Sequence, residues 1–201
     1  MHTGDAVPLA PLGAAMSDAI LQMSAKGFGC VGIVDAQGKL LPHFITISNI
    51  VSRDPVQVKA GNERVVRPRL SDAAFFWNQD RKQRLESHID KLGTMVFQTK
   101  LGTLLDKQQR VAVLAGYIAT AIGADKQLAE RAAMLAKCDL LTHMVFDFPE
   151  LQGVMGRYYA LDQEEDEAVA DAIGTHYKPV GPSDDVPREK VAVAVALADK
   201  L

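Results

Sequence analysis

The stretch from Lys137 to Gly156, KCDLLTHMVFDFPELQGVMG, constrains the fold most strongly. It begins as the end of an apolar helix that carries one acidic residue, and Pro149 stops the helical pattern. Gly153 and Gly156 then fall in the first turns of the next helix. Because each glycine costs a helix about 1 kcal/mol relative to alanine, two of them indicate a close approach of another helix. We therefore expect this stretch to form the centre of a helical bundle.

Helical signals dominate the chain from Ser71 onwards. Ser71 is a good N-cap, and Asp72 follows it in the first turn. Asp106 can cap a helix whose apolar residues recur at spacings of three and four, and Gly123 ends that helix. Asp125 begins the next helix. The remaining elements that we expect are an acidic helix over 162–177, a loop over 178–187 and a last helix over 188–201.

The N-terminal part has a different pattern. Residues 30–34 and 40–48 are β-branched and apolar, and the turn sequence Asp35-Ala36-Gln37-Gly38 separates them. They predict a β-hairpin, which is too small to be stable alone. Before it we expect a loose terminus over 1–11 and a short helix over 16–23. We divide the chain into an N-terminal segment, residues 1–60, which would be the end of an upstream sheet domain, and a helical domain, residues 61–201.

Composition excludes several classes of protein. A net charge of −3 argues against a uniformly basic nucleic-acid surface, although a local basic patch is compatible with it. The two cysteines, Cys30 and Cys138, lie far apart and indicate a reducing cytoplasm rather than a disulfide scaffold. No apolar run reaches the roughly 18 residues that a membrane span needs, and the N-terminus lacks the features of a signal peptide.

One candidate site is a metal centre. The order of helices, with an Asp after one apolar helix and Ala-Asp-Lys-Leu near the end, resembles the His-Asp (HD) phosphohydrolase superfamily. The resemblance implies a mainly α fold, an HD-domain-like helical bundle with a small N-terminal β-hairpin. It aligns the family's metal ligands with Lys107, Cys138, Asp139, His176 and Asp199.

These aligned residues predict a poor divalent-metal site. A lysine at the position of the first histidine would repel a cation, and Cys138 replaces the histidine of the His-Asp pair. We expect Asp139 to accept hydrogen bonds inside the bundle, and Cys138 to be a small core residue. His143 fits the surface or edge of a helix.

A second candidate site is the segment 62–84, which is basic and aromatic in an otherwise acidic chain. Pro68 predicts that Arg67 is extended and lies off the helix. Arginine side chains fit phosphates, and Phe75-Phe76-Trp77 could offer a stacking face for bases. The alternative is that the aromatic residues anchor the helix in the core and the arginines pair with the acidic helix after residue 162. Our candidates for RNA phosphate contacts are Arg64, Arg67, Arg69, Arg81 and Lys82.

Long motifs in this part of the chain carry a specific resemblance. The sequence GNERVVRPRLSDA over 61–73, followed by Phe75-Phe76 and Asp80-Arg81-Lys82, resembles the β subunit of the bacterial heterotetrameric glycyl-tRNA synthetase. So do Phe97-Gln98 with Leu101-Gly102-Thr103, Lys137-Cys138-Asp139-Leu140, Met144-Val145-Phe146 and the run 150–156. The resemblance extends from about residue 38 to residue 201. Residues 24–32 depart from a segment that the family has before the hairpin.

The resemblance implies a non-catalytic role in glycyl-tRNA formation. The family's α subunit activates glycine with ATP and magnesium, so this chain would need no cofactor of its own. The β subunit binds tRNA(Gly), and its central helical region is a degenerate HD domain. The chain would be about a third of a subunit from a cytoplasmic heterotetramer, with sheet domains before it and an anticodon-binding domain after it.

Two other functions remain open from the sequence. One is a metal-dependent HD phosphohydrolase that acts on a nucleotide and holds its metal with Asp139, Asp199 and His176. The other is an assembly module whose helical face, around Phe146 and Phe148, docks on the α subunit or on other β domains.

Overall fold

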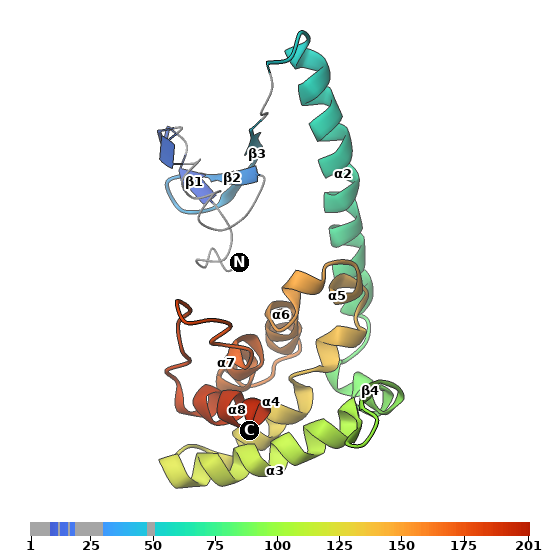
Figure 1. The fold of residues 1–201 in the computed structure, drawn as a ribbon, viewed down its shortest axis with the longest axis vertical. Coiled ribbons are helices and arrows are strands. Elements are labelled where there is room, and N and C mark those ends of the chain that lie inside the picture. Colours follow the sequence, from blue (N-terminus) through green and yellow to red (C-terminus); the bar gives the residue numbers. More distant parts are fainter. Residues whose placement is uncertain (1–8, 12, 16, 19–29, 48–50) are drawn as a thin grey trace. The chain divides into compact units, whose positions relative to one another are not determined.

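The computed structural model describes residues 9–11, 13–15, 17–18, 30–47 and 51–201. The chain divides into two compact units, residues 1–62 and 63–201. The predicted fold class is confirmed as mainly α with a small β part (Figure 1). No helix among these residues is both long enough and apolar enough to cross a membrane.

The first unit contains the predicted hairpin. Strand β2 (Cys30–Val34) pairs antiparallel with β3 (Leu40–Thr46). The Asp35 side chain organises the turn by accepting hydrogen bonds from the Gln37 and Lys39 amides. A third strand, β1 (Leu9–Pro11), pairs parallel with β2, so the loose terminus predicted over 1–11 is wrong for residues 9–11. Of the short helix predicted over 16–23, only residues 17 and 18 lie within the described part, and they are helical.

Helix α2 (Pro55–Asp80) corrects the predicted helix start at Ser71. The Asp54 side chain accepts hydrogen bonds from the Val56 and Gln57 amides, and Pro55 takes the first helical position, which suits its missing N–H. The helix continues through Pro68, so Arg67 is helical rather than extended. A proline is typical of a helix boundary, but here Pro68 lies inside a helix of 26 residues.

The two helices that follow begin with well-defined caps. After the 3-10 helices η1 (Leu85–His88) and η2 (Asp90–Thr94), strands β4 (Val96–Gln98) and β5 (Gly102–Thr103) form a small hairpin. Helix α3 (Leu104–Ile122) starts before the predicted cap, because Thr103 is the N-cap and Asp106 completes a capping box. Its predicted end at Gly123 and the predicted N-cap of helix α4 (Lys126–Leu135), Asp125, are confirmed.

The C-terminal half contains more breaks than the sequence predicted. Helix α4 ends at Leu135, and the central stretch continues as η3 (Cys138–Leu141), α5 (His143–Asp147) and η4 (Pro149–Leu151). The acidic helix predicted over 162–177 is present but shorter, and its predicted start is wrong. Helix α6 (Val154–Asp162) ends where it should start, and α7 (Glu167–Thr175) begins after the new N-cap Asp166. The predicted last helix is confirmed as α8 (Lys190–Lys200).

The core of the second unit lies where α3, α4, α7 and α8 meet, with α6 packed on α7 (Figure 1). Alanines fill the helix contacts, so the backbones approach closely. The predicted close approach at the two glycines is confirmed. A Cβ on Gly156 would lie 2.7 Å from Ile173 Cγ2 and 3.0 Å from Asp139 Oδ2, and Gly153 has φ +78°. This approach brings the amides of both glycines to the Asp139 carboxylate.

Candidate functional site

Lysines, rather than a metal-ligand set, surround Asp199. This residue is near the end of α8, and Lys107 on α3 donates to its Oδ1 at 2.6 Å. Lys137, in the turn between α4 and η3, donates to Oδ2 at 3.0 Å. The Lys137 ammonium also lies 2.9 Å from His176 Nε2 and 3.7 Å from the centre of the Tyr177 ring. We call Lys107, Lys137, His176 and Asp199 the lysine cluster.

The electrostatics of the lysine cluster fix its protonation states. Burial lowers the pKa of His176 to about 3, and the nearby Lys137 ammonium adds to this effect. The imidazole is therefore neutral, donates from Nδ1 to the Ile173 carbonyl at 2.7 Å and accepts from Lys137 at Nε2. Burial alone would raise the pKa of Asp199, but the two ammonium groups lower it below its ordinary value. The cluster is thus charged at neutral pH and largely satisfied internally.

The other two aligned positions, Asp139 and Cys138, form no hydrogen bond with the lysine cluster among the described residues. Asp139 Oδ2 accepts hydrogen bonds from the Gly153 and Gly156 amides, at 2.6 and 3.1 Å, as its predicted role requires. Cys138 is fully buried, and burial raises the pKa of its thiol to about 12, which confirms it as a core residue. In the part of the chain that the structure describes, no three His, Cys, Asp or Glu side chains gather in a way that could hold a metal ion. The aligned positions therefore hold two lysine-bonded side chains, a buried thiol and a hydrogen-bonded carboxylate rather than a set of ligands that fits a divalent metal.

The buried Asp139 carboxyl should make the stability of the protein depend on pH. Burial raises its pKa to about 6, against the opposing hydrogen bonds from the two glycine amides. A raised carboxyl pKa means that the folded protein holds the proton more tightly than the unfolded chain. The stability from this group is therefore present below the ordinary aspartate pKa and is lost as the pH rises to about 6. The loss should be about 3 kcal/mol in the free energy of unfolding.

The measurement is urea unfolding as a function of pH, compared with Asp139→Asn. The amide cannot ionise, so the difference in unfolding free energy between the two proteins should change between acidic and neutral pH and then level off. Other carboxylates, including Asp80 and Asp199, are common to both proteins and cancel. A pH-independent difference would contradict the raised pKa.

The predicted phosphate-binding residues separate into two groups. Arg69 pairs with Asp147 at 3.0 Å and lies over the Phe148 ring, 4.4 Å from its centre. Arg81 pairs with Asp162. The alternative expected pairing with the acidic helix after residue 162, whereas this partner is the last residue of α6. These two arginines tie α2 to the bundle.

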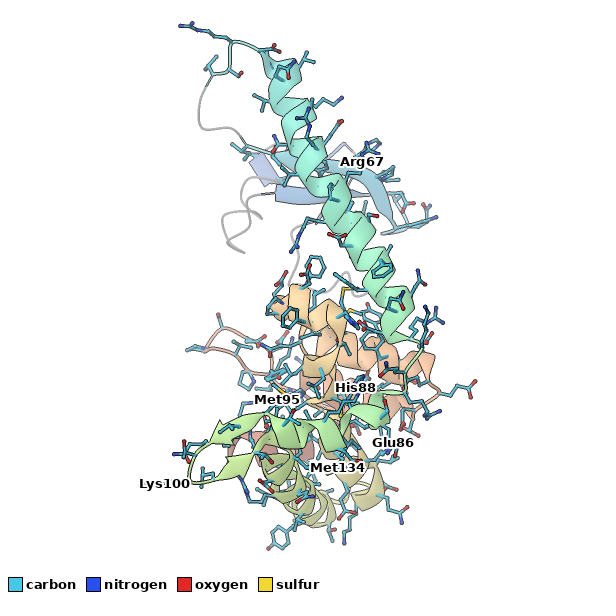
Figure 2. All side chains as sticks on the ribbon, turned by 90° about the vertical axis from the view of Figure 1, so that its right-hand side faces the viewer. Arg67, Glu86, His88, Met95, Lys100 and Met134 are labelled. Carbon is cyan, nitrogen blue, oxygen red and sulfur yellow. The ribbon has the colours of Figure 1, made fainter. Side chains whose placement is uncertain are left out.

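The second group has exposed charges. Arg64 and Arg67 lie exposed on α2 and form no ion pair with any residue that the structure describes, and Figure 2 shows Arg67 on the shaft of the helix away from the other labelled residues. Lys82 follows the end of α2, and its ammonium donates only to Gln79 Oε1 at 2.8 Å among the described residues. These three cations are available to an external anion.

The aromatic residues of α2 also separate. Phe76 and Trp77 pack against the core. The ring centres of Trp77 and Tyr159 are 5.3 Å apart in a stacked arrangement. Those of Phe76 and His143 are 6.1 Å apart and are also stacked. For these two, the expected anchoring role is confirmed. Phe75 points outward and is 58% exposed. A stacking face made of all three rings is therefore wrong.

Sequence reasoning missed two residues that organise this region. Asp80, at the end of α2, accepts four hydrogen bonds, from the His143 and Met144 amides, His143 Nδ1 and the Tyr159 hydroxyl. Burial would raise its pKa, but these bonds lower it below the ordinary value. The sequence carries no signal that Asp80 caps a helix 63 residues away. Lys137 did have a signal, since a lysine at the end of an apolar run is expected to be paired if it is buried, and the structure shows it 5% exposed.

Comparison with known proteins gives one consistent result. The model of the family described as "Glycyl-tRNA synthetase beta subunit" matches residues 19–201. The chain is 58% identical over 168 residues to the glycine–tRNA ligase beta subunits of Mannheimia succiniciproducens and Actinobacillus succinogenes, covering 84% of this chain and 24% of each relative. It is 57% identical over 169 residues to that of Chromohalobacter salexigens, covering 84% of this chain and 25% of the relative.

These alignments refine two expectations about extent. The family match begins at residue 19 rather than near residue 38, so it includes the divergent residues 24–32, most of which lie outside the described residues. The chain spans about a quarter of the length of the curated relatives it matches, so the predicted third is too large.

Proposed function

Since the chain belongs to the glycyl-tRNA synthetase β subunit family, we propose that it is a tRNA-binding part of that subunit with no catalytic role of its own. The observation that carries this proposal is the group of exposed cations on α2 that no described residue pairs with, in a chain with a net charge of −3. Clustered cations on one element favour a polyanion, whose phosphates release counterions on binding.

The proposed phosphate contacts are ranked by their present partners. Arg64, Arg67 and Lys82 would contact phosphates directly, because no described acidic residue competes for them. Arg69 and Arg81 would first have to exchange Asp147 and Asp162 for a phosphate. Their loss would weaken RNA binding less and destabilise the attachment of α2.

Charge reversal tests the proposal directly. In the variant Arg67→Glu, tRNA affinity should fall roughly tenfold at low salt, and the slope of log affinity against log salt should decrease by about one. The physical reason is the loss of one phosphate contact together with its released counterion. Filter binding or fluorescence anisotropy over a salt series measures both quantities.

The matched control is Lys126→Glu, which changes the net charge by the same amount at an exposed position of α4. It should leave the salt slope unchanged. If the two substitutions weakened tRNA binding equally, the change in net charge would explain the effect and not a contact at Arg67. An unchanged affinity in Arg67→Glu would overturn the proposed contact.

The wider assignments follow from the family and are part of the proposal. The partners would be the α subunit and tRNA(Gly) in a cytoplasmic heterotetramer. ATP and magnesium would be used by the α subunit, and this chain would bind neither. The phosphohydrolase alternative lacks support, because Asp199 and His176 are bonded to lysines.

A second candidate function, assembly, is favoured by Phe146. This residue on α5 is 85% exposed, whereas Phe148 packs against the core and beneath Arg69. A large exposed aromatic side chain is common at interfaces between proteins. If α5 docks on another subunit, Phe146→Ser should weaken co-purification of the α subunit without changing tRNA affinity.

A further inference from the structure

One face of α2 combines cations that no described residue pairs with and a single exposed ring. Residues that recur every three or four positions share a side of a helix. From Arg64 to the end of α2, this face carries only exposed residues: Arg64, Arg67, Pro68, Ser71, Ala74, Phe75 and Asn78. We call these seven residues the α2 stripe.

No acidic residue belongs to the α2 stripe. Glu63 and Asp72 lie roughly 80° to 100° away around the helix axis from its centre. Asp80 lies on the opposite side, buried against α5 and α6. The only charged residues of the stripe are therefore arginines, whereas the whole chain has a net charge of −3. Its charge is complementary to a phosphate backbone.

Phe75 is held in place although its ring is exposed. It meets Phe76 edge to face, with ring centres 5.9 Å apart and planes at 65°. Phe76 in turn stacks on His143, whose Nδ1 is hydrogen-bonded to Asp80 at 2.8 Å. A ring whose support is packed and hydrogen-bonded loses little conformational entropy when it binds a ligand.

The spacing along the stripe suits a nucleic acid strand. Phe75 is about 12 Å from Arg67 and about 16 Å from Arg64 along the helix axis. Toward the C-terminal end of α2, Gln79 lies about one turn beyond Phe75 and accepts a hydrogen bond from the Lys82 ammonium. Cations thus lie on both sides of the ring. Ser71 and Asn78, between them, can hydrogen-bond a sugar or a base edge.

We propose that the α2 stripe binds an unpaired segment of RNA, with one base stacked on Phe75 and the flanking phosphates on Arg64, Arg67 and Lys82. A ring needs the face of a base, and a continuous duplex exposes base faces only at its ends. The stripe therefore distinguishes single-stranded from double-stranded RNA, which phosphate contacts alone would not do. This inference rests on the proposed function and narrows its ligand.

The test uses the whole 201-residue chain and two probes. One is a single-stranded oligoadenylate of about ten nucleotides, and the other is an RNA duplex of about forty base pairs, in which the two ends are few among the possible binding sites. Phe75→Leu keeps an apolar side chain but removes the ring, so affinity for the single strand should fall roughly 5- to 100-fold. Affinity for the duplex should stay unchanged. Phe75→Trp should retain single-strand binding.

Two comparisons make the outcomes distinct. Phe97→Leu, at an exposed ring on β4 outside the stripe, should leave both affinities unchanged. Arg67→Glu should weaken both probes. If Arg67→Glu weakens binding but Phe75→Leu does not, or if Phe75→Leu weakens both probes equally, the stacking inference is overturned and the proposed function stands. If neither substitution affects RNA binding, or the chain binds no RNA, both are overturned and a protein partner becomes the occupant of the stripe.

Discussion

Replacing Asp199 with alanine should destabilise the protein by about 3–5 kcal/mol, the cost typical of breaking a buried ion pair. The carboxylate is the only hydrogen-bonded anion that the structure describes for two ammonium groups, Lys107 and Lys137. Without it, Lys137 stays buried with a neutral imidazole and the Tyr177 ring as its partners. Two like charges would then face each other in a poorly solvated site.

Urea unfolding at neutral pH, followed by circular dichroism, measures the loss. A buried lysine without a counter-ion has a lowered pKa in the folded state, so the cost in Asp199→Ala should shrink as the pH rises toward the ordinary lysine pKa. The double variant Lys137→Met/Asp199→Ala should be more stable than Asp199→Ala, because methionine removes the unpaired charge. If the two variants were equally unstable, the lysine cluster would not be a coupled unit.

The matched control is Asp162→Ala, which removes the partner of Arg81 from a more exposed ion pair. Such pairs contribute about 0–1 kcal/mol, so this loss should be several times smaller. A comparable loss of unfolding free energy in both variants would mean that burial does not make the ion pairs of the lysine cluster more stabilising than an exposed pair.

Replacing Asp80 with alanine should destabilise the protein by about 3 kcal/mol, since buried donors left without acceptors cost about 1–3 kcal/mol each. The substitution removes the acceptor for two amides at the start of α5, one imidazole and one phenol. It should also loosen the junction between α2 and the bundle, where Trp77 stacks on Tyr159. Trypsin should then cut faster at the basic residues that follow the helix, 81, 82 and 84.

Asp72→Ala provides the control, because Asp72 is an exposed acid of the same helix. It should change the unfolding free energy by no more than about 0.5 kcal/mol. The pKa of Asp80 is lowered in the folded state, so its stabilisation is present above the ordinary aspartate pKa and is lost as the pH falls below it. Wild-type stability and Asp80→Ala stability should therefore converge in acid. Unchanged trypsin cleavage in Asp80→Ala would contradict its role at the junction.

Local sequence patterns determined the elements whose signals are complete within a few residues. The hairpin turn at Asp35, the N-cap Asp125 and the helix stop at Gly123 all depend on bonds between near neighbours. The two glycines of the central stretch likewise predicted a close approach, since a helix position without a side chain leaves room for a neighbouring element. Long motifs in order also carried the family resemblance, which the comparisons confirm.

Only the tertiary structure decided which charges are available. From the sequence, Arg67 and Arg69 look equivalent, but their helical positions place Arg69 against Asp147 and leave Arg67 exposed. Asp80 is bonded to His143, 63 residues away, and Lys137 to Asp199, 62 residues away. No local sequence pattern encodes contacts at such separations. Helix periodicity fixes which residues share a side, whereas packing fixes which side is buried. The acid-free stripe of α2 exists because Asp80, Phe76 and Trp77 turn the opposite side toward the bundle.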